Sequence, residues 1–197
     1  MSVPLLHLAS SSPRRGAILE QMGLEFSAAG VDIDERPHPG ESADIMVVRL
    51  AVEKAGAACC DPETVVIGAD TAVVLDDEVF GKPCDEADGL RMLAALSGCS
   101  HQVMTGVAVR SARGVESVLS VTEVKFRDIG PDEAREYWQS GEPRDKAGAY
   151  AIQGLAGDFV EAVTGSYTGV VGLPVFETAR LLQMAGIEPA ADLKDRL

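Results

Sequence analysis

Residues 65–75 read VVIGADTAVVL, and this stretch decides the fold class. It is an almost continuous apolar run, interrupted only by Asp70 and Thr71, which is typical of a strand buried on both faces. The acidic turn at 76–78 ends the run. Strands of this kind belong to sheets that helices cover on both sides, so the stretch predicts an α/β protein.

The segments on either side alternate between strand and helix patterns. The expected strands and short apolar pieces cover about 5–9, 65–75, 102–110, 115–127, 159–163 and 170–173. The expected helices cover about 14–22, 43–58, 86–96, 131–139 and 174–184. A short polar turn at 111–114 predicts an antiparallel hairpin in the middle of the chain. We therefore expect a mixed twisted sheet flanked by helices, and one domain over 1–197, because no Pro/Ser/Gly-rich linker divides the sequence.

The charge balance excludes one class of partner. The 197 residues include 17 Lys+Arg and 31 Asp+Glu, which give a formal net charge of −14. Extended binding to nucleic acid needs a cationic face, and no basic run or aromatic platform is present, so we expect no nucleic-acid partner. No apolar run approaches the roughly 18 residues of a membrane span, and no basic, apolar leader opens the chain. The sequence thus predicts a cytoplasmic protein with no membrane partner.

Common nucleotide and hydrolase motifs are missing. The chain has no G-x-G-x-x-G, no G-x-x-x-x-G-K-[ST], no H-E-x-x-H and no G-x-S-x-G. Its three histidines and its four cysteines, which form no C-x-x-C pair, offer little for a histidine triad or a zinc site. Any chemistry must therefore depend on other residues.

The start of the first expected helix has an unusual charge pattern. Ser12 and Pro13 open it, and Arg14 and Arg15 occupy its first turn, where the positive end of the helix dipole favours acidic side chains. A bound anion would resolve this conflict, because backbone N–H groups, a hydroxyl and two guanidinium groups form a receptor for phosphate or carboxylate. The alternative is that both arginines are solvated surface residues.

Asp70 is the second anomaly, because a carboxylate within a buried strand costs several kcal/mol unless it is paired or binds a metal. It could ligate a divalent cation or accept a proton from an attacking water. Alternatively, it is a structural residue that caps a turn at the end of the strand. Lys54 and Lys82 are basic residues that could reach the same cleft, although either could be an ordinary surface lysine. Gln153 offers an amide donor and acceptor to a planar ligand.

Seven motifs, in order along the chain, carry a resemblance to a known family. They are Leu8-Ala9-Ser10 with Ser12-Pro13-Arg14-Arg15, Arg49-Leu50-Ala51 with Glu53-Lys54-Ala55, Gly68-Ala69-Asp70-Thr71, Gly81-Lys82-Pro83, Leu96-Ser97-Gly98, Lys146-Ala147-Gly148-Ala149-Tyr150 with Ile152-Gln153-Gly154, and Gly172-Leu173-Pro174. Together they resemble the Maf family of nucleoside triphosphate pyrophosphatases over nearly the whole chain. The resemblance implies the inosine-triphosphate-pyrophosphatase-like fold, with a central nucleotide cleft, and a homodimer.

The resemblance also implies an activity: hydrolysis of a nucleoside triphosphate to the monophosphate and pyrophosphate, with Mg²⁺ or Mn²⁺. The segment around Gln153 is similar to the branch that acts on dTTP and UTP rather than 7-methyl-GTP, with CTP and modified pyrimidine nucleotides as further candidates. The implied roles are the proton acceptor for Asp70, substrate selection for Arg14, Thr71 and Gln153, and phosphate binding for Ser12, Arg14, Arg15, Lys54 and Lys82.

Two questions stay open from the sequence. The carboxylates that join Asp70 in holding the metal are not determined, and Glu35 and Glu41, in the acidic segment before the second helix, are candidates. The competing function is a non-catalytic, nucleotide-binding regulator of cell division, as suggested for this family. Tight nucleotide binding without turnover would favour that alternative.

Overall fold

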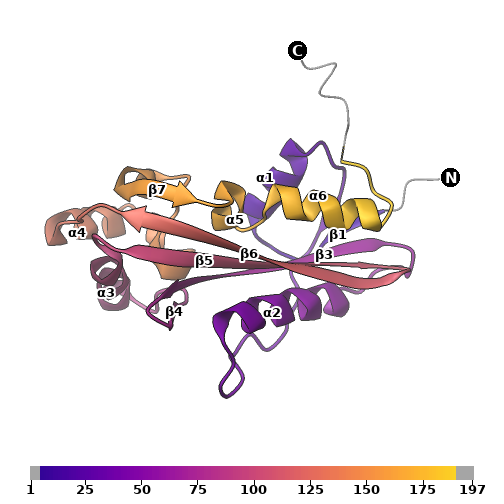
Figure 1. Cartoon of the computed structure of the whole chain (residues 1–197), viewed down its shortest axis with the longest axis horizontal. Coiled ribbons are helices and arrows are strands. Elements are labelled where there is room, and N and C mark those ends of the chain that lie inside the picture. Colours follow the sequence, from indigo (N-terminus) through magenta and orange to yellow (C-terminus); the bar gives the residue numbers. More distant parts are fainter. Residues whose placement is uncertain (1–4, 190–197) are drawn as a thin grey trace, which may run out of the picture. The chain divides into compact units, whose positions relative to one another are not determined.

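The computed structural model describes residues 5–189, and its helices and strands follow the expected alternation (Figure 1). The strands are β1 (Leu6–Leu8), β2 (Ser27–Ala28), β3 (Val65–Leu75), β4 (Glu78–Phe80), β5 (Ser100–Ser111), β6 (Gly114–Phe126) and β7 (Val160–Thr164). The α-helices are α1 (Pro13–Gln21), α2 (Ala43–Ala57), α3 (Glu86–Leu96), α4 (Pro131–Gln139), α5 (Tyr167–Val171) and α6 (Val175–Met184). Three short 3₁₀ helices are η1 (Glu142–Asp145), η2 (Ala147–Ala149) and η3 (Leu155–Phe159).

The strands of the described residues form one seven-stranded mixed sheet. Its order is β2-β1-β3-β5-β6-β7, and β4 pairs with β3. β1 is parallel to both β2 and β3, whereas the β3–β4 and β6–β7 pairs are antiparallel. The mixed α/β fold expected from the sequence is therefore confirmed.

The chain divides into two compact units. Of the described residues, unit 1 contains 5–70, 105–120 and 172–189, and unit 2 contains 71–104 and 121–171. The boundaries at 70/71, 104/105 and 120/121 fall within β3, β5 and β6, and the boundary at 171/172 lies at the end of α5.

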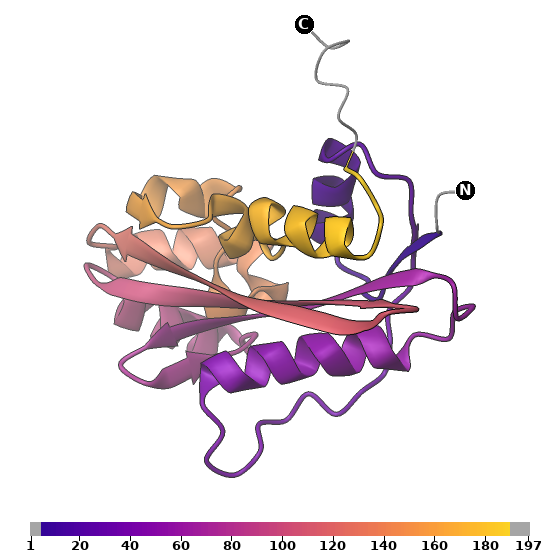
Figure 2. The ribbon, with the colours of Figure 1, turned by 45° about the vertical axis from the view of Figure 1, so that its right-hand side comes forward.

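In unit 1, α2 lies along one face of the strands, and α1 and α6 lie on the other (Figures 1 and 2). Two glycines allow α2 to approach closely. A Cβ on Gly68 would come within 2.1 Å of the Ala51 carbonyl oxygen, and one on Gly106 within 2.3 Å of the Val47 carbonyl oxygen. Because only hydrogen fits at either position, the backbone of α2 can rest directly on β3 and β5.

Unit 2 has its own apolar core. Phe80, Leu93 and Phe126 are almost fully buried there, and α3 meets α4 where Gly89 faces the Trp138 ring. Gly98, with a φ of +67°, lies two residues after the end of α3, where a left-handed conformation favours glycine. The core fixes the strands and loops on which the unit 2 site residues lie.

The predicted strand over 65–75 is confirmed, because β3 continues through both Asp70 and Thr71. Two other segments differ from the sequence prediction. The acidic turn is a β-hairpin, in which Asp76 and Asp77 adopt positive φ angles of 48° and 66° before β4. The apolar piece at 170–173 begins within helix α5 instead of forming an independent extended segment.

Candidate active site

The start of α1 has the features of an anion receptor. Pro13 occupies the first helical position, and the first turn carries no acidic residue. Within residues 5–189, the Ser12 side chain makes no capping hydrogen bond to the helix. The N–H groups of the first turn are therefore not satisfied by the usual side-chain cap, which leaves the positive end of the helix dipole suited to a phosphate.

Arg15 is fixed by polar contacts on two sides. Its Nε donates to the Gly172 carbonyl oxygen at 2.8 Å, and its Nη1 donates to the Ser10 hydroxyl at 3.2 Å. Burial lowers the pKa of the Arg15 guanidinium; Asp70 and Glu35 oppose this effect, and Arg14 adds to it. Arginine stays protonated despite such shifts, so unit 1 holds a buried positive charge within electrostatic reach of two carboxylates.

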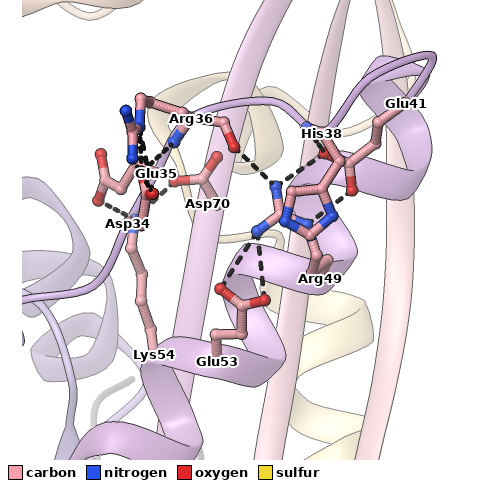
Figure 3. Close-up of polar contacts among 9 residues, drawn as sticks. All are labelled: Asp34, Glu35, Arg36, His38, Glu41, Arg49, Glu53, Lys54 and Asp70. Carbon is pink, nitrogen blue, oxygen red and sulfur yellow. Dashed lines mark hydrogen bonds and ion pairs between the residues drawn. The ribbon is translucent and has the colours of Figure 1, made fainter.

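Lys54 joins those two carboxylates. Its Nζ lies 2.7 Å from Asp70 Oδ1 and 2.7 Å from Glu35 Oε1 (Figure 3). The side chains of Lys54 and Asp70 are only 10% and 15% exposed, whereas Glu35 is 58% exposed. The partner that the buried Asp70 requires is therefore Lys54, and Glu35 is the outer member of the cluster.

The packing of α2 on β3 explains this pairing. Asp70 lies two residues after Gly68 and therefore on the same face of the strand. Lys54 lies one helical turn after Ala51, whose carbonyl oxygen meets Gly68. The close approach at Gly68 thus brings the lysine ammonium to the carboxylate.

Arg49 tethers the segment that carries Glu35. It donates to the two oxygens of Glu41 at 2.6 and 2.7 Å, to the Arg36 carbonyl oxygen at 3.3 Å and to Glu53 at 3.2 Å. The contacts to Arg36 and Glu41 attach the segment on the C-terminal side of Glu35 to α2 (Figure 3). Their consequence is that Glu35 is presented to Lys54 by a loop held at several points.

Glu41 does not fit the role of metal ligand that the sequence left open for it. Its side chain is 5% exposed, and both carboxylate oxygens accept hydrogen bonds from Arg49. These hydrogen bonds, and a further one from the His38 N–H, lower the pKa of Glu41 to about 2. Glu41 is therefore a structural residue that holds the loop.

The donor set of Asp70 and Glu35 fits a divalent cation. Both carboxylates contact one ammonium group, so their oxygens already converge on a single positive charge. Among residues 5–189, no group of three or more His, Cys, Asp or Glu side chains is arranged to hold a metal. Mg²⁺ commonly binds through one or two carboxylates together with substrate phosphates and water, so two carboxylates suffice.

The remaining predicted site residues lie in unit 2. Thr71 is half-buried on β3, while Lys82 and Gln153 are exposed on loops. The loop of Lys82 is fixed by a hydrogen bond from the Gly148 N–H to the Gly81 carbonyl oxygen at 3.1 Å. The structure thus joins the Gly81-Lys82-Pro83 loop to the 146–150 segment.

Sequence reasoning missed several residues that shape these sites. Ser10 and Gly172 were recognised only as parts of motifs, although both contact Arg15. Tyr137 and Glu142, which contact the loop of Gln153, carried no pattern of their own. The only sequence features that could have indicated these contacts were nearby glycines, which often mark close approaches of the backbone.

The chain is similar to known proteins over most of its length. Residues 5–185 match the family described as Maf-like protein. A dTTP/UTP pyrophosphatase of Chromobacterium violaceum is 52% identical over 189 residues, covering 93% of this chain and 96% of that protein. A dTTP/UTP pyrophosphatase of Hahella chejuensis is 49% identical over 191 residues, covering 95% of each chain.

Among solved structures, a nucleoside-triphosphatase, a dITP/XTP pyrophosphatase of Mycobacterium abscessus, is 16% identical, with a TM-score of 0.38 over 61% of this chain and 72% of that one. This score is too low to add to the fold description. In the part of the chain that the structure describes, no helix is both long enough and apolar enough to cross a membrane.

Proposed function

The chain belongs to the family of Maf-like proteins, and on that basis we propose that it is a nucleoside triphosphate pyrophosphatase that hydrolyses dTTP and UTP to the monophosphate and pyrophosphate. The relatives with about half of their residues identical over nearly their full length carry this activity in their names. CTP and modified pyrimidine nucleotides are further candidate substrates.

One observation carries the proposal: the Lys54 ammonium lies between Asp70 and Glu35 while Arg15 lies within electrostatic reach of both carboxylates. With Arg14, this part of unit 1 holds three cationic side chains against two carboxylates, within a chain of net charge −14. A local positive excess of this kind attracts a small triphosphate while the rest of the surface repels long polyanions.

The proposed reaction is the attack of water on the α-phosphorus. Asp70 accepts the proton from that water, the bond from the α-phosphorus to the bridging oxygen breaks, and pyrophosphate leaves. Lys54 orients Asp70 through the 2.7 Å contact. Arg14, Arg15 and the N–H groups at the start of α1 stabilise the phosphate oxygens where negative charge develops.

We propose that a divalent cation, Mg²⁺ or Mn²⁺, is held by Asp70 and Glu35 during turnover. Such an ion would supply charge neutralisation at the phosphate oxygens. Lys54, which contacts both carboxylates, would add a positive charge beside the same phosphates.

The unit 2 residues are proposed to select the substrate. Gln153 has an amide that can both donate to and accept from the edge of a pyrimidine base. Thr71 and Arg14 share the selection of substrate, and Lys82 adds a phosphate contact, as the family resemblance implies. We also propose that the protein forms a homodimer and is located in the cytoplasm.

The direct experiment is to incubate the purified chain with Mg²⁺ and a panel of dTTP, UTP, CTP, dATP, dGTP and 5-methyl-UTP. Pyrophosphate and orthophosphate are measured separately. We expect stoichiometric pyrophosphate and monophosphate, fastest from dTTP and UTP. Orthophosphate as the product, or tight binding without turnover in Mg²⁺ and in Mn²⁺, would overturn the proposal; the second result would favour a nucleotide-binding regulator.

A further inference from the structure

The turn that carries Gln153 has exposed residues on a buried frame. Gln153, Gly154 and Leu155 are exposed, while the flanking Ile152 and Ala156 are buried. The Gly154 N–H donates to the Ala151 carbonyl oxygen at 2.9 Å, which closes the turn. The orientation of an exposed glutamine on such a turn depends on the backbone of the turn. The contacts that hold this backbone therefore influence where the Gln153 amide lies.

Tyr137 of α4 holds the entrance to the turn. Its side chain is 5% exposed, and its hydroxyl accepts a hydrogen bond from the Ala151 N–H at 3.1 Å. The same hydroxyl donates to Glu142 Oε1 at 2.8 Å. Burial and the Glu142 carboxylate raise the pKa of Tyr137 far above its ordinary value, so the hydroxyl remains a donor at neutral pH.

Glu142 holds the exit of the turn. Its Oε2 accepts from the Leu155 N–H at 3.1 Å, and its Oε1 accepts from the Ala156 N–H at 3.4 Å. The Tyr137–Glu142 pair therefore bonds to the backbone on both sides of Gln153, and its members are linked to each other. All of these groups belong to unit 2.

The Glu142 carboxylate lies very close to the backbone at Gly154. A Cβ at this position would lie 2.0 Å from Glu142 Oε2, a distance at which the carboxylate must move. Since φ at Gly154 is −110°, an alanine here would not strain the backbone, and its effect would be to displace the Glu142 carboxylate.

We propose that Tyr137 and Glu142 are positioning residues that aim the Gln153 amide and thereby determine which nucleotide base the protein accepts. This inference rests on the proposed function and extends it to two residues that touch no reacting atom. They act through Gln153 because their hydrogen bonds end on the backbone of its turn.

Three variants disturb the Tyr137–Glu142 pair, called the clamp below, in different ways. Tyr137→Phe removes only the hydroxyl. Glu142→Gln places an NH₂ group where one of the two carboxylate oxygens accepts, so it cannot satisfy the Tyr137 hydroxyl and both N–H groups together. Gly154→Ala displaces the carboxylate without removing it. The matched controls are Tyr167→Phe and Glu161→Gln, at exposed positions of the same unit.

The readout is the ratio of kcat/KM for dTTP to kcat/KM for dATP. We expect each clamp variant to lower this ratio about tenfold, toward the value of Gln153→Ala, while the controls keep the wild-type ratio. Combining Glu142→Gln with Gln153→Ala should give no further fall beyond Gln153→Ala alone, because the clamp acts through that amide. An unchanged ratio in folded clamp variants, or additive losses in the double variant, would overturn the inference.

Amide hydrogen exchange separates this inference from the proposed function. In Glu142→Gln we expect faster exchange at Leu155 and Ala156, with a thermal midpoint that shows a folded chain. Wild-type exchange rates at both amides in this variant would show that no clamp exists, whatever the activity. If the wild-type chain releases no pyrophosphate from any nucleotide while the exchange result holds, the proposed function fails and the selectivity role fails with it, but the clamp stands.

Discussion

The candidate site residues of the two units are held by different kinds of interaction. In unit 1, Lys54 forms ion pairs with Asp70 and Glu35, and Arg15 interacts electrostatically with the same two carboxylates. In unit 2, the Gln153 turn is held by directed hydrogen bonds, in which backbone N–H groups donate to Tyr137 and Glu142. Charge interactions fall off slowly with distance, whereas hydrogen bonds require close and aligned partners. Under the proposed function, the charged cluster of unit 1 serves the phosphate chemistry, and the Gln153 turn of unit 2 serves recognition of the base.

The largest effect is expected for Asp70→Asn, which removes the proposed proton acceptor in unit 1. Loss of a general base lowers rates by about 10²- to 10⁴-fold, so we expect kcat to fall about 10³-fold with KM little changed. Steady-state pyrophosphate release measures this fall. The control is Asp132→Asn, an exposed aspartate paired with Arg135 on α4, which should retain full activity. Activity of Asp70→Asn near that of the control would refute the assignment of the base.

The next prediction concerns unit 2 and is a dependence of its stability on pH. His101 is buried against Phe126 and Tyr150, its Nε2 lies 2.9 Å from the Tyr150 hydroxyl, and its Nδ1 has no partner among the described residues. Burial lowers the pKa of His101 from 6.5 to about 4. Below pH 6.5 the unfolded chain therefore binds a proton that the folded chain does not, until the pH approaches 4.

Stability should consequently fall as the pH falls from 6.5 to about 4, and this histidine contributes about 3 kcal/mol over the window. Urea unfolding at pH 6.5 and pH 5 measures the slope. His101→Gln keeps a polar partner for Tyr150 without the titration, so it should show a shallower slope. Parallel slopes in both proteins would mean that His101 is not held neutral.

Arg15→Met tests whether unit 1 works through charge. It removes the guanidinium that contacts Gly172 and Ser10, and we expect kcat/KM for dTTP to fall about 10²-fold, mainly through KM. The loss should shrink as salt is raised, because screening weakens charge interactions in the wild type as well. Arg180→Met on the exposed side of α6 is the matched control. A loss confined to kcat would place Arg15 in a different role.

Gln153→Ala gives the smallest effect and the sharpest contrast with unit 1. We expect the preference for dTTP over dATP to fall about tenfold while kcat for dATP stays close to the wild-type value. The competition assay uses both nucleotides in one reaction. If kcat instead falls equally for all nucleotides, Gln153 belongs with the phosphate chemistry and the division between the units is wrong.

The sequence was most informative where local patterns decide structure. The helices at 86–96 and 131–139 were predicted to the residue, because caps and apolar spacing mark their ends. A carboxylate within an apolar strand indicated that Asp70 needs a partner, but the sequence did not show which residue that partner is. Lys54 is the partner because Gly68 and Gly106 let α2 rest on the sheet, and this tertiary contact has no periodic signal.

Other contacts could not be predicted from the sequence for similar reasons. The Glu142 bonds to the Gln153 turn bridge more than ten residues of irregular chain, which carries no helical or strand periodicity. Glu41 looked as suitable as Glu35 for a metal, since both lie in one acidic segment. Only the position of Arg49 distinguishes them, because it takes both oxygens of Glu41.

The central claim is that Asp70 directs water to the α-phosphorus, and turnover in H₂¹⁸O tests it most directly. The wild-type chain hydrolyses dTTP with Mg²⁺, and mass spectrometry locates the label in the products. We predict one ¹⁸O atom in dTMP and none in pyrophosphate. Label in pyrophosphate, or orthophosphate as the labelled product, would show that water attacks a different phosphorus and would contradict the account.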